Sequence, residues 1–361
     1  MAGMAHSRIA WIDHAKGICI VLVVMLYAVD LIERTAGREG WLHAVVRFAA
    51  PFRMPDFFLV SGLLLSRVIG RDWRTYLERK VVHFAYFYLL WLTILVAFES
   101  PWIAAKAGWP GVAALYLRSL VTPYSMLWFI YLLPVFFVVT KLAQRMPAAV
   151  MWTLAAALQV AQLETGVKVI DKFAAYYVFF YSGYVLAPQV FRFAEAVSSH
   201  RGKALLALGA WGVLDGTLAF AGHASLPGIS LALAFLGAAA AIALAASISG
   251  MRVFAPLRYC GEHSIVIYLA FLVPMVVTRK VLVTTRLVED VGSMSLVATI
   301  AAIAGALALY WLVRGTRLRF LFERPERISL ERLSHSPTFA TANTSPTPVA
   351  RYSTVVERRD P

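Results

Sequence analysis

The chain has 361 residues, of which 60% are hydrophobic and only 15% are charged. Because a soluble domain carries about 25% charged residues, this composition argues against a soluble protein and predicts an integral membrane protein. The net charge of +14 does not indicate nucleic-acid binding, since the basic residues lie between apolar runs, where Lys and Arg set membrane topology.

Ten apolar runs are long enough, or nearly so, to cross the ~30 Å hydrocarbon core of a bilayer. They cover residues 17–32, 48–69, 82–98, 124–140, 147–163, 173–191, 204–221, 226–249, 263–278 and 294–313. The sequence therefore predicts an all-α polytopic bundle of about ten transmembrane helices in one domain, residues 1–333. Residues 334–361 are rich in Ser, Thr and Pro, which predicts a disordered cytoplasmic tail.

The basic residues between these runs predict the orientation. With the N-terminus in the cytoplasm, fourteen Lys and Arg residues fall in the inner segments and eleven in the outer ones. Nine further arginines follow Val313. This excess predicts that both termini lie in the cytoplasm, as an even number of spans requires. The first run is expected to remain as an anchor, because the residues before it do not resemble a cleaved signal peptide.

The first run begins just after Asp13 and Lys16, which are expected at its cytoplasmic mouth. Tyr27 lies eleven residues beyond Lys16, about 16 Å deeper along a helix. Asp30 follows Tyr27 after one turn and shares its face. Taken singly, Lys16 is an ordinary topology-setting residue and Tyr27 a packed aromatic side chain. Cys19 lies inside this run and Cys260 at the edge of a later one, which favours neither a disulfide framework nor a metal site.

The second run carries two charges, Arg53 and Asp56, in the segment PFRMPDFFLVSGLLLS. Three residues apart on a helix, they share one face and are expected to pair. A charge deep in hydrocarbon costs at least about 2.5–3.5 kcal/mol, so such residues usually mark a site. The other interpretation is that Arg53 extends to the nearer water edge and Asp56 neutralises it.

Two further groups of side chains are candidates for ligand binding. Arg79 and Lys80, with Arg71 and Arg74 nearby, form a dense basic patch that would attract either a phosphate-rich ligand or lipid headgroups. Trp128 and a group of tyrosines could line a sugar or acyl cavity, although aromatic residues near span ends more often form the interfacial belt. The tyrosines are Tyr176, Tyr177, Tyr181 and Tyr184.

Five segments in order resemble the acyltransferase 3 family of multi-span membrane acyltransferases, and the resemblance runs from Ile9 to Val313. The segments are WIDHAKGICIVLVVMLYAVD, FRMPDFFLVSGLLLS, YLERKVVHFAYFYLLW, LWFIYLLPVFF and GEHSIVIYLAF. Two positions depart from the family pattern. Tyr27 stands where the family has a histidine, its likely general base, and Ala270-Phe271 stands where many members have another. A tyrosine with an ordinary pKa near 10 is a poor base at pH 7.

Three histidines, His14, His83 and His263, remain as alternative bases, although a structural role is favoured for each. The chain has no HExxH, GxSxG or Walker A motif, so metal hydrolysis, a serine hydrolase and nucleotide hydrolysis lack their usual sequence signals.

The resemblance implies an enzyme of the bacterial inner membrane that transfers an acyl group, acetyl or succinyl, from acyl-CoA to a hydroxyl of a glycan or other envelope component. Acyl-CoA is then a substrate, and no cofactor or metal is expected. The implied roles are catalytic for Tyr27, Asp13 and Lys16, and substrate-binding for Arg79, Lys80, Arg53, Asp56 and Trp128. The alternative is an impaired relative that acts as a transporter or binding protein, which Tyr27 favours.

Overall fold

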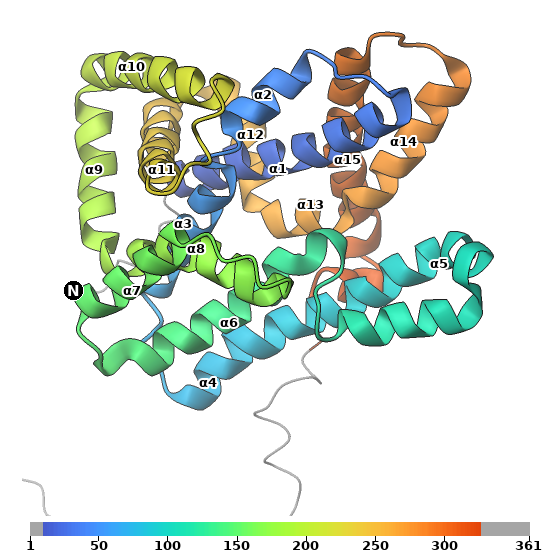
Figure 1. Cartoon of the computed structure of the whole chain (residues 1–361), viewed down its shortest axis with the longest axis horizontal. Helices are drawn as coiled ribbons and strands as arrows, with labels where there is room; N and C mark the ends of the chain where they lie inside the picture. Colours follow the sequence, from blue (N-terminus) through green and yellow to red (C-terminus); the bar gives the residue numbers. More distant parts are fainter. Residues whose placement is uncertain (1–9, 326–361) are drawn as a thin grey trace, which may run out of the picture. The chain divides into compact units, whose positions relative to one another are not determined.

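The computed structural model describes residues 10–325, and every regular element in that range is a helix. The elements up to residue 127 are α1 (Ala10–Ala36), α2 (Leu42–Ala49), α3 (Arg53–Leu65), α4 (Trp73–Leu77), η1 (Glu78–Val82), α5 (His83–Ser119) and η2 (Ser125–Leu127). Next come α6 (Trp128–Leu142), η3 (Ala143–Arg145), α7 (Ala148–Val160), α8 (Lys168–Val185), α9 (Ala187–Ser199) and α10 (Arg201–Phe220). The last are α11 (Ile229–Ile248), η4 (Arg252–Phe254), α12 (Ala255–Glu262), α13 (Ser264–Ala270), α14 (Leu272–Thr285), α15 (Val291–Arg314) and η5 (Arg317–Leu321). The all-α prediction is confirmed (Figure 1).

Each of the ten predicted runs coincides with helix. Within residues 10–325, six helices are long and apolar enough to cross a membrane, and up to eight spans result if two bent pairs count as one span each. These pairs are α2 with α3, bent by 48°, and α13 with α14, bent by 54°. Of the two remaining runs, α7 has only 13 residues, and α8 begins with Lys168, Asp171 and Lys172. The predicted number of ten is therefore approximate, and the polytopic helical architecture holds.

The predicted runs leave residues 99–123 as a connection between 82–98 and 124–140, but residues 99–119 are helical. They form the second part of α5, which breaks at Gly108 (φ 69°) and turns back on itself, as Figure 1 shows. The two parts touch through the hydroxyls of Thr93 and Tyr116, 3.0 Å apart. Pro101 and Pro110 lie inside this helix, and proline is tolerated in a membrane helix when neighbours satisfy the backbone groups that it frees.

Helices α3 and α8 pack closely against each other. A Cβ atom added at Gly62 would lie 2.0 Å from the carbonyl oxygen of Phe180, and one added at Gly183 would lie 2.0 Å from that of Leu59. Small residues at both positions let the two backbones approach, as is usual between membrane helices. This contact fixes the position of Arg53 and Asp56 on α3 relative to Tyr176 on α8.

The predicted tail, residues 334–361, lies outside the described residues, as does the boundary of the predicted domain at residue 333. Arg8, one of the charges used to predict the orientation, is also outside this range.

Candidate functional site

Helix α3 runs past three hollows, which are named here by their lining. Pro51 and Pro55, at its start, line a polar cavity of about 620 Å³. Its middle residues line an apolar pocket of about 130 Å³; they are Phe57, Val60, Ser61 and Leu64. Val68 and Arg71, just beyond its end, line a basic pocket of about 260 Å³. Since 13 helical residues span about 20 Å, the polar cavity and the basic pocket lie at opposite ends of this helix.

The basic pocket brings together two of the predicted binding residues. Arg79 and Lys80 line it with Arg71, whereas Arg74 does not. Arg79 and Lys80 lie on η1, a π-helical turn between α4 and α5. Such turns are rare in proteins, and those that occur are often found at functional sites. Three cationic side chains around one hollow suit a ligand with several phosphates.

The apolar pocket opens beside the basic pocket, because Lys80 lines both. The Lys80 ammonium lies 4.7 Å from the centre of the Phe137 ring. Lys16 also lines the apolar pocket, and its ammonium lies 3.7 Å from a carboxylate oxygen of Asp13. The predicted grouping of Asp13 and Lys16 is therefore present, at the same end of the bundle as Lys80.

The predicted ion pair between Arg53 and Asp56 is not formed. Asp56 instead accepts a hydrogen bond from the thiol of Cys19 on α1, with Sγ and Oδ2 2.7 Å apart. Arg53 Nη1 lies 3.5 Å from the carbonyl oxygen of Val46, back toward α2. Asp30, the acidic residue of the first run, pairs with Arg34 at 2.7 Å. Arg53 is the first residue of α3 and Asp56 faces α1, so the two side chains diverge although they share a helix.

The burial of the Asp56 carboxyl group carries a free-energy cost. Its side chain is 1% exposed, and its Oδ1 has no hydrogen-bond partner among the residues that the structure describes. Leaving a buried acceptor unsatisfied costs roughly 1–3 kcal/mol, and more for a charged group. Arg53 is also buried, and its Nε has no partner within residues 10–325.

An aromatic cluster next to Tyr268 of the apolar pocket contains Tyr27 and Trp128. The Tyr27 hydroxyl approaches the Trp128 indole, and the Arg53 guanidinium acts electrostatically on both Tyr27 and Tyr176. The rings of Trp128 and Tyr176 stack with centroids 5.5 Å apart. Tyr268, which lines the apolar pocket, also interacts electrostatically with Tyr27. Tyr27, Arg53 and Trp128 therefore form one group, separate from Lys16 and Asp13.

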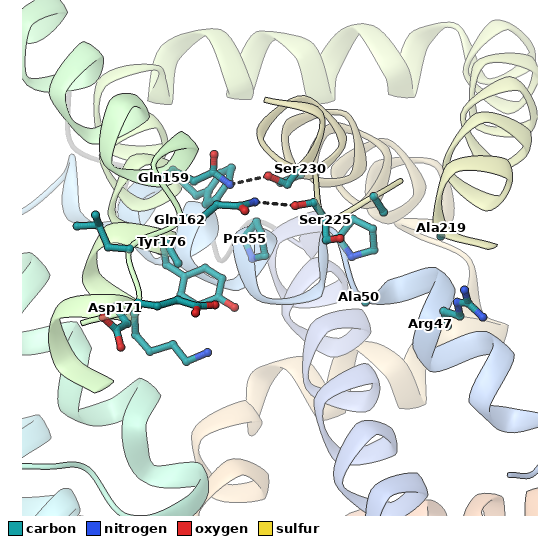
Figure 2. Close-up of a pocket in the computed structure, with 18 of the residues that line it drawn as sticks. Arg47, Ala50, Pro55, Gln159, Gln162, Asp171, Tyr176, Ala219, Ser225 and Ser230 are labelled. Carbon is teal, nitrogen blue, oxygen red and sulfur yellow. Dashed lines mark hydrogen bonds between the residues drawn. The ribbon is translucent and has the colours of Figure 1, made fainter. Parts of the chain in front are cut away.

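The cluster also borders the polar cavity. Lys172 and Tyr176 line this cavity, and the Lys172 ammonium lies 5.3 Å from the centre of the Trp128 ring. Figure 2 shows Tyr176 and Asp171 on the wall that α8 provides. The side-chain hydroxyl and backbone N–H of Thr165 donate hydrogen bonds to Asp171 and hold the pKa of this exposed carboxyl below its usual range.

Amide side chains line the part of the cavity next to Tyr176. Gln159 donates to the Ser230 hydroxyl at 3.0 Å, and Gln162 donates to the Ser225 carbonyl at 2.6 Å, as the dashed lines in Figure 2 show. The Oε1 atom of Gln159 is buried and has no hydrogen-bond partner within residues 10–325. The cavity therefore combines an aromatic wall with amide, hydroxyl, carboxylate and ammonium groups, which suits a polar ligand with several hydroxyls.

None of the three candidate histidines lines any of the three hollows. The ring nitrogens of His14 and His263 hydrogen-bond the carbonyls of Ala10 and Tyr259, at 2.8 Å and 3.0 Å. His83 packs edge-on against Phe87 with ring centroids 5.0 Å apart. These contacts are consistent with a structural role for all three histidines.

Sequence reasoning missed two features of the site. Cys19 was set aside as a residue inside an apolar run, and its contact with Asp56 crosses 37 positions without any local signal. Lys172 was counted only as a topology charge, although it joins Trp128 to the polar cavity. Within residues 10–325, no group of three or more His, Cys, Asp or Glu side chains is placed to hold a metal ion.

The profile of an acyltransferase domain family, acyltransferase 3, matches residues 9–314. The chain is 28% identical over 214 residues to the nodulation protein NolL of Sinorhizobium fredii, covering 58% of this chain and 56% of NolL. It is 27% identical over 165 residues to the inner membrane protein YcfT of Escherichia coli, covering 38% of this chain and 44% of YcfT. The chain thus spans about half the length of these relatives. No solved structure matches it significantly. Because the family profile covers most of the sequence, the chain belongs to the acyltransferase 3 family of membrane proteins.

Proposed function

We propose that this protein transfers a short acyl group, acetyl or succinyl, from acyl-CoA to a hydroxyl of a glycan or other envelope component. The donor enters from the end of the bundle that carries the basic pocket, and the acceptor binds in the polar cavity at the other end of α3. The reaction needs no cofactor, because the thioester of the donor supplies the activated acyl group.

One observation carries this proposal: Lys80 lines the basic pocket and the apolar pocket together. An acyl-CoA has several phosphates at one end and an uncharged thioester arm at the other. Arg71, Arg79 and Lys80 match the phosphates, and the apolar pocket matches the arm. The volume of that pocket, about 130 Å³, favours a short acyl chain over a long one.

Tyr27 and Arg53 are proposed to act on the acceptor side. A phenol with an ordinary pKa is protonated at pH 7, so Tyr27 is suited to donate a hydrogen bond rather than to take a proton. With the Arg53 guanidinium nearby, it would stabilise the negative charge that develops on the carbonyl oxygen during transfer. Trp128 and Tyr176 would present an aromatic face to a sugar ring in the polar cavity.

The proposed location is a bacterial inner membrane, with both termini in the cytoplasm. This orientation puts Arg71, Arg79 and Lys80 on the side where acyl-CoA is available. It rests on the excess of basic residues in the predicted inner segments. The name of the relative YcfT, an inner membrane protein, is consistent with this location.

A transfer assay tests the proposal. The purified protein in lipid nanodiscs is mixed with radiolabelled acetyl-CoA or succinyl-CoA and a panel of glycans, and each glycan is scored for label. We expect label on at least one glycan, and less of it with Lys80→Ala. Saturable binding of acyl-CoA without transfer to any acceptor would instead support the rival, a binding or transport protein, which the missing family histidine at Tyr27 favours.

A further inference from the structure

Cys19 and Asp56 form a buried pair that the proposed transfer does not yet use. The Cys19 thiol donates to Asp56 Oδ2 at 2.7 Å, and Cys19 lines the apolar pocket with Lys16 and Lys80. The second oxygen of Asp56, Oδ1, is buried and has no hydrogen-bond partner within the part of the chain that the structure describes. A purely structural contact would leave that acceptor unexplained. A proton-accepting group with a spare oxygen next to a thiol is the arrangement of an activated nucleophile.

We propose that Cys19 accepts the acyl group from the donor as a covalent thioester, with Asp56 as the base that takes the thiol proton. This inference rests on the proposed function and adds an intermediate to it. The apolar pocket brings the donor thioester to Cys19, because Lys80 and Cys19 both line it. Cys19 is 1% exposed, so its sulfur is reached through this pocket rather than from the membrane.

The two half-reactions balance. First, Cys19 Sγ attacks the thioester carbonyl carbon while its proton moves to Asp56; the carbon–sulfur bond to CoA breaks, and the CoA thiolate takes the proton from Asp56. Second, the acceptor oxygen attacks the Cys19 thioester while its proton moves to Asp56. The Cys19 thiolate leaves and recovers that proton. The net products are the acyl ester and free CoA, and no oxidant or further reactant is needed.

The position of Asp56 fits a relay between the two hollows. Its neighbour Pro55 lines the polar cavity, while its partner Cys19 lines the apolar pocket. The pair therefore lies where the donor side and the acceptor side of α3 meet. The same carboxyl group is placed to serve both half-reactions, in the absence of the histidine that the family uses.

Trapping the intermediate tests this inference. Wild type and three variants are mixed in nanodiscs with radiolabelled acetyl-CoA, without acceptor, and quenched in acid. The variants are Cys19→Ser, Asp56→Asn and, as the matched control, Cys260→Ser, which removes the other free cysteine of the described chain. Wild type and Cys260→Ser should carry label that neutral hydroxylamine releases, as it does from thioesters. Cys19→Ser should carry no such label, and Asp56→Asn should form it about 10²-fold or more slowly.

Steady-state transfer completes the test. Cys19→Ser keeps a hydrogen-bond donor for Asp56, so its binding of acetyl-CoA should match wild type and show that it is folded, while its transfer to a glycan falls at least 10²-fold. Transfer by Cys19→Ser at the wild-type rate would overturn the inference and leave the proposed function intact. So would a wild type that transfers label but never carries it. A wild type that neither carries nor transfers label would overturn the proposed function itself.

Discussion

Lys80 and Arg79 are neighbours in the sequence, but they contact different parts of the proposed donor site. Both line the basic pocket, and only Lys80 continues into the apolar pocket. Their position on a π-helical turn matters, because the turn shifts the register of the residues that follow it. Substitution of Arg79 should therefore affect binding of the donor phosphates without affecting binding of the thioester arm.

Arg79→Ala should raise the KM for acetyl-CoA about 10-fold or more, because a hydrogen bond to a charged group contributes roughly 1.5–3 kcal/mol. The sharpest control is acetyl-pantetheine, which lacks the nucleotide phosphates. Its KM should be the same for wild type and Arg79→Ala, and Arg74→Ala, outside the basic pocket, should change neither value. An equal rise in KM for both donors would show that Arg79 does not contact phosphate.

Tyr27→Phe keeps the ring that packs against Phe271, with centroids 5.4 Å apart, and removes only the hydroxyl. If this hydroxyl stabilises the developing oxyanion, kcat should fall about 10²-fold with no change in the KM for acetyl-CoA. Tyr310→Phe, a half-buried tyrosine on α15, is the matched control. A Tyr27→Phe variant with unchanged kcat would return Tyr27 to the role of a packed aromatic side chain.

The sequence predicted some contacts between individual side chains correctly and others wrongly. Arg79 with Lys80, and Asp13 with Lys16, are close in sequence, which was enough to predict that each pair lies in one region. The pairing of Arg53 with Asp56 followed from helical spacing and was wrong. The rule gives the face of a helix but not the neighbour that competes for each side chain. Here the Cys19 thiol on α1 binds Asp56, and the Val46 carbonyl on α2 binds Arg53, so the two charged side chains do not pair.

Helix α3 organises the candidate site, because its length separates the polar cavity from the basic pocket and its face lines the pocket between them. The unusual charge content of residues 51–66 indicated this importance in the sequence. The break of α5 at Gly108 was not predicted, since glycine and proline in a segment are equally typical of a loop. The bend between α2 and α3 was not predicted either, because it lies within one continuous apolar run.

Gly62→Ala should destabilise the protein, because the new methyl group would lie 2.0 Å from the carbonyl oxygen of Phe180. Forcing extra volume into a packed interface typically costs about 1–3 kcal/mol, so the melting temperature in detergent should fall. Gly209→Ala on α10 is the matched control, since nothing lies within 4 Å of its added Cβ. If both variants melt at the wild-type temperature, α3 and α8 are not held by this contact.

For the molecule as a whole, composition alone predicted a membrane protein built from helices, because the apolar content is too high for any other class. The number of spans was less certain from the sequence. Short or bent helices such as α7 and the α13–α14 pair satisfy an apolar-run criterion without the geometry of a straight span. The polar cavity and the apolar pocket depend on contacts between distant helices, so their shape could not be predicted from the sequence, whereas the clustered charges of the basic pocket could.

The proposed orientation predicts which loops face the cytoplasm. In intact cells, a membrane-impermeant maleimide should label His223→Cys, in the exposed connection between α10 and α11. It should label Gln144→Cys, in η3, only after the membrane is permeabilised. Wild type is the control for the native cysteines, Cys19 and Cys260. Labelling of both positions from the same side, or the reverse pattern, would contradict the orientation.

Sealed vesicles give the most direct test of the proposal that the protein transfers an acyl group between a donor and an acceptor bound at opposite ends of α3. The protein is reconstituted into vesicles that trap a glycan inside, chosen because it accepts label in the nanodisc assay. Radiolabelled acetyl-CoA is then added outside. The two-ended arrangement predicts label on the trapped glycan, and less of it when the protein carries Lys80→Ala. Label that reaches the glycan only when donor and acceptor share one compartment would contradict it.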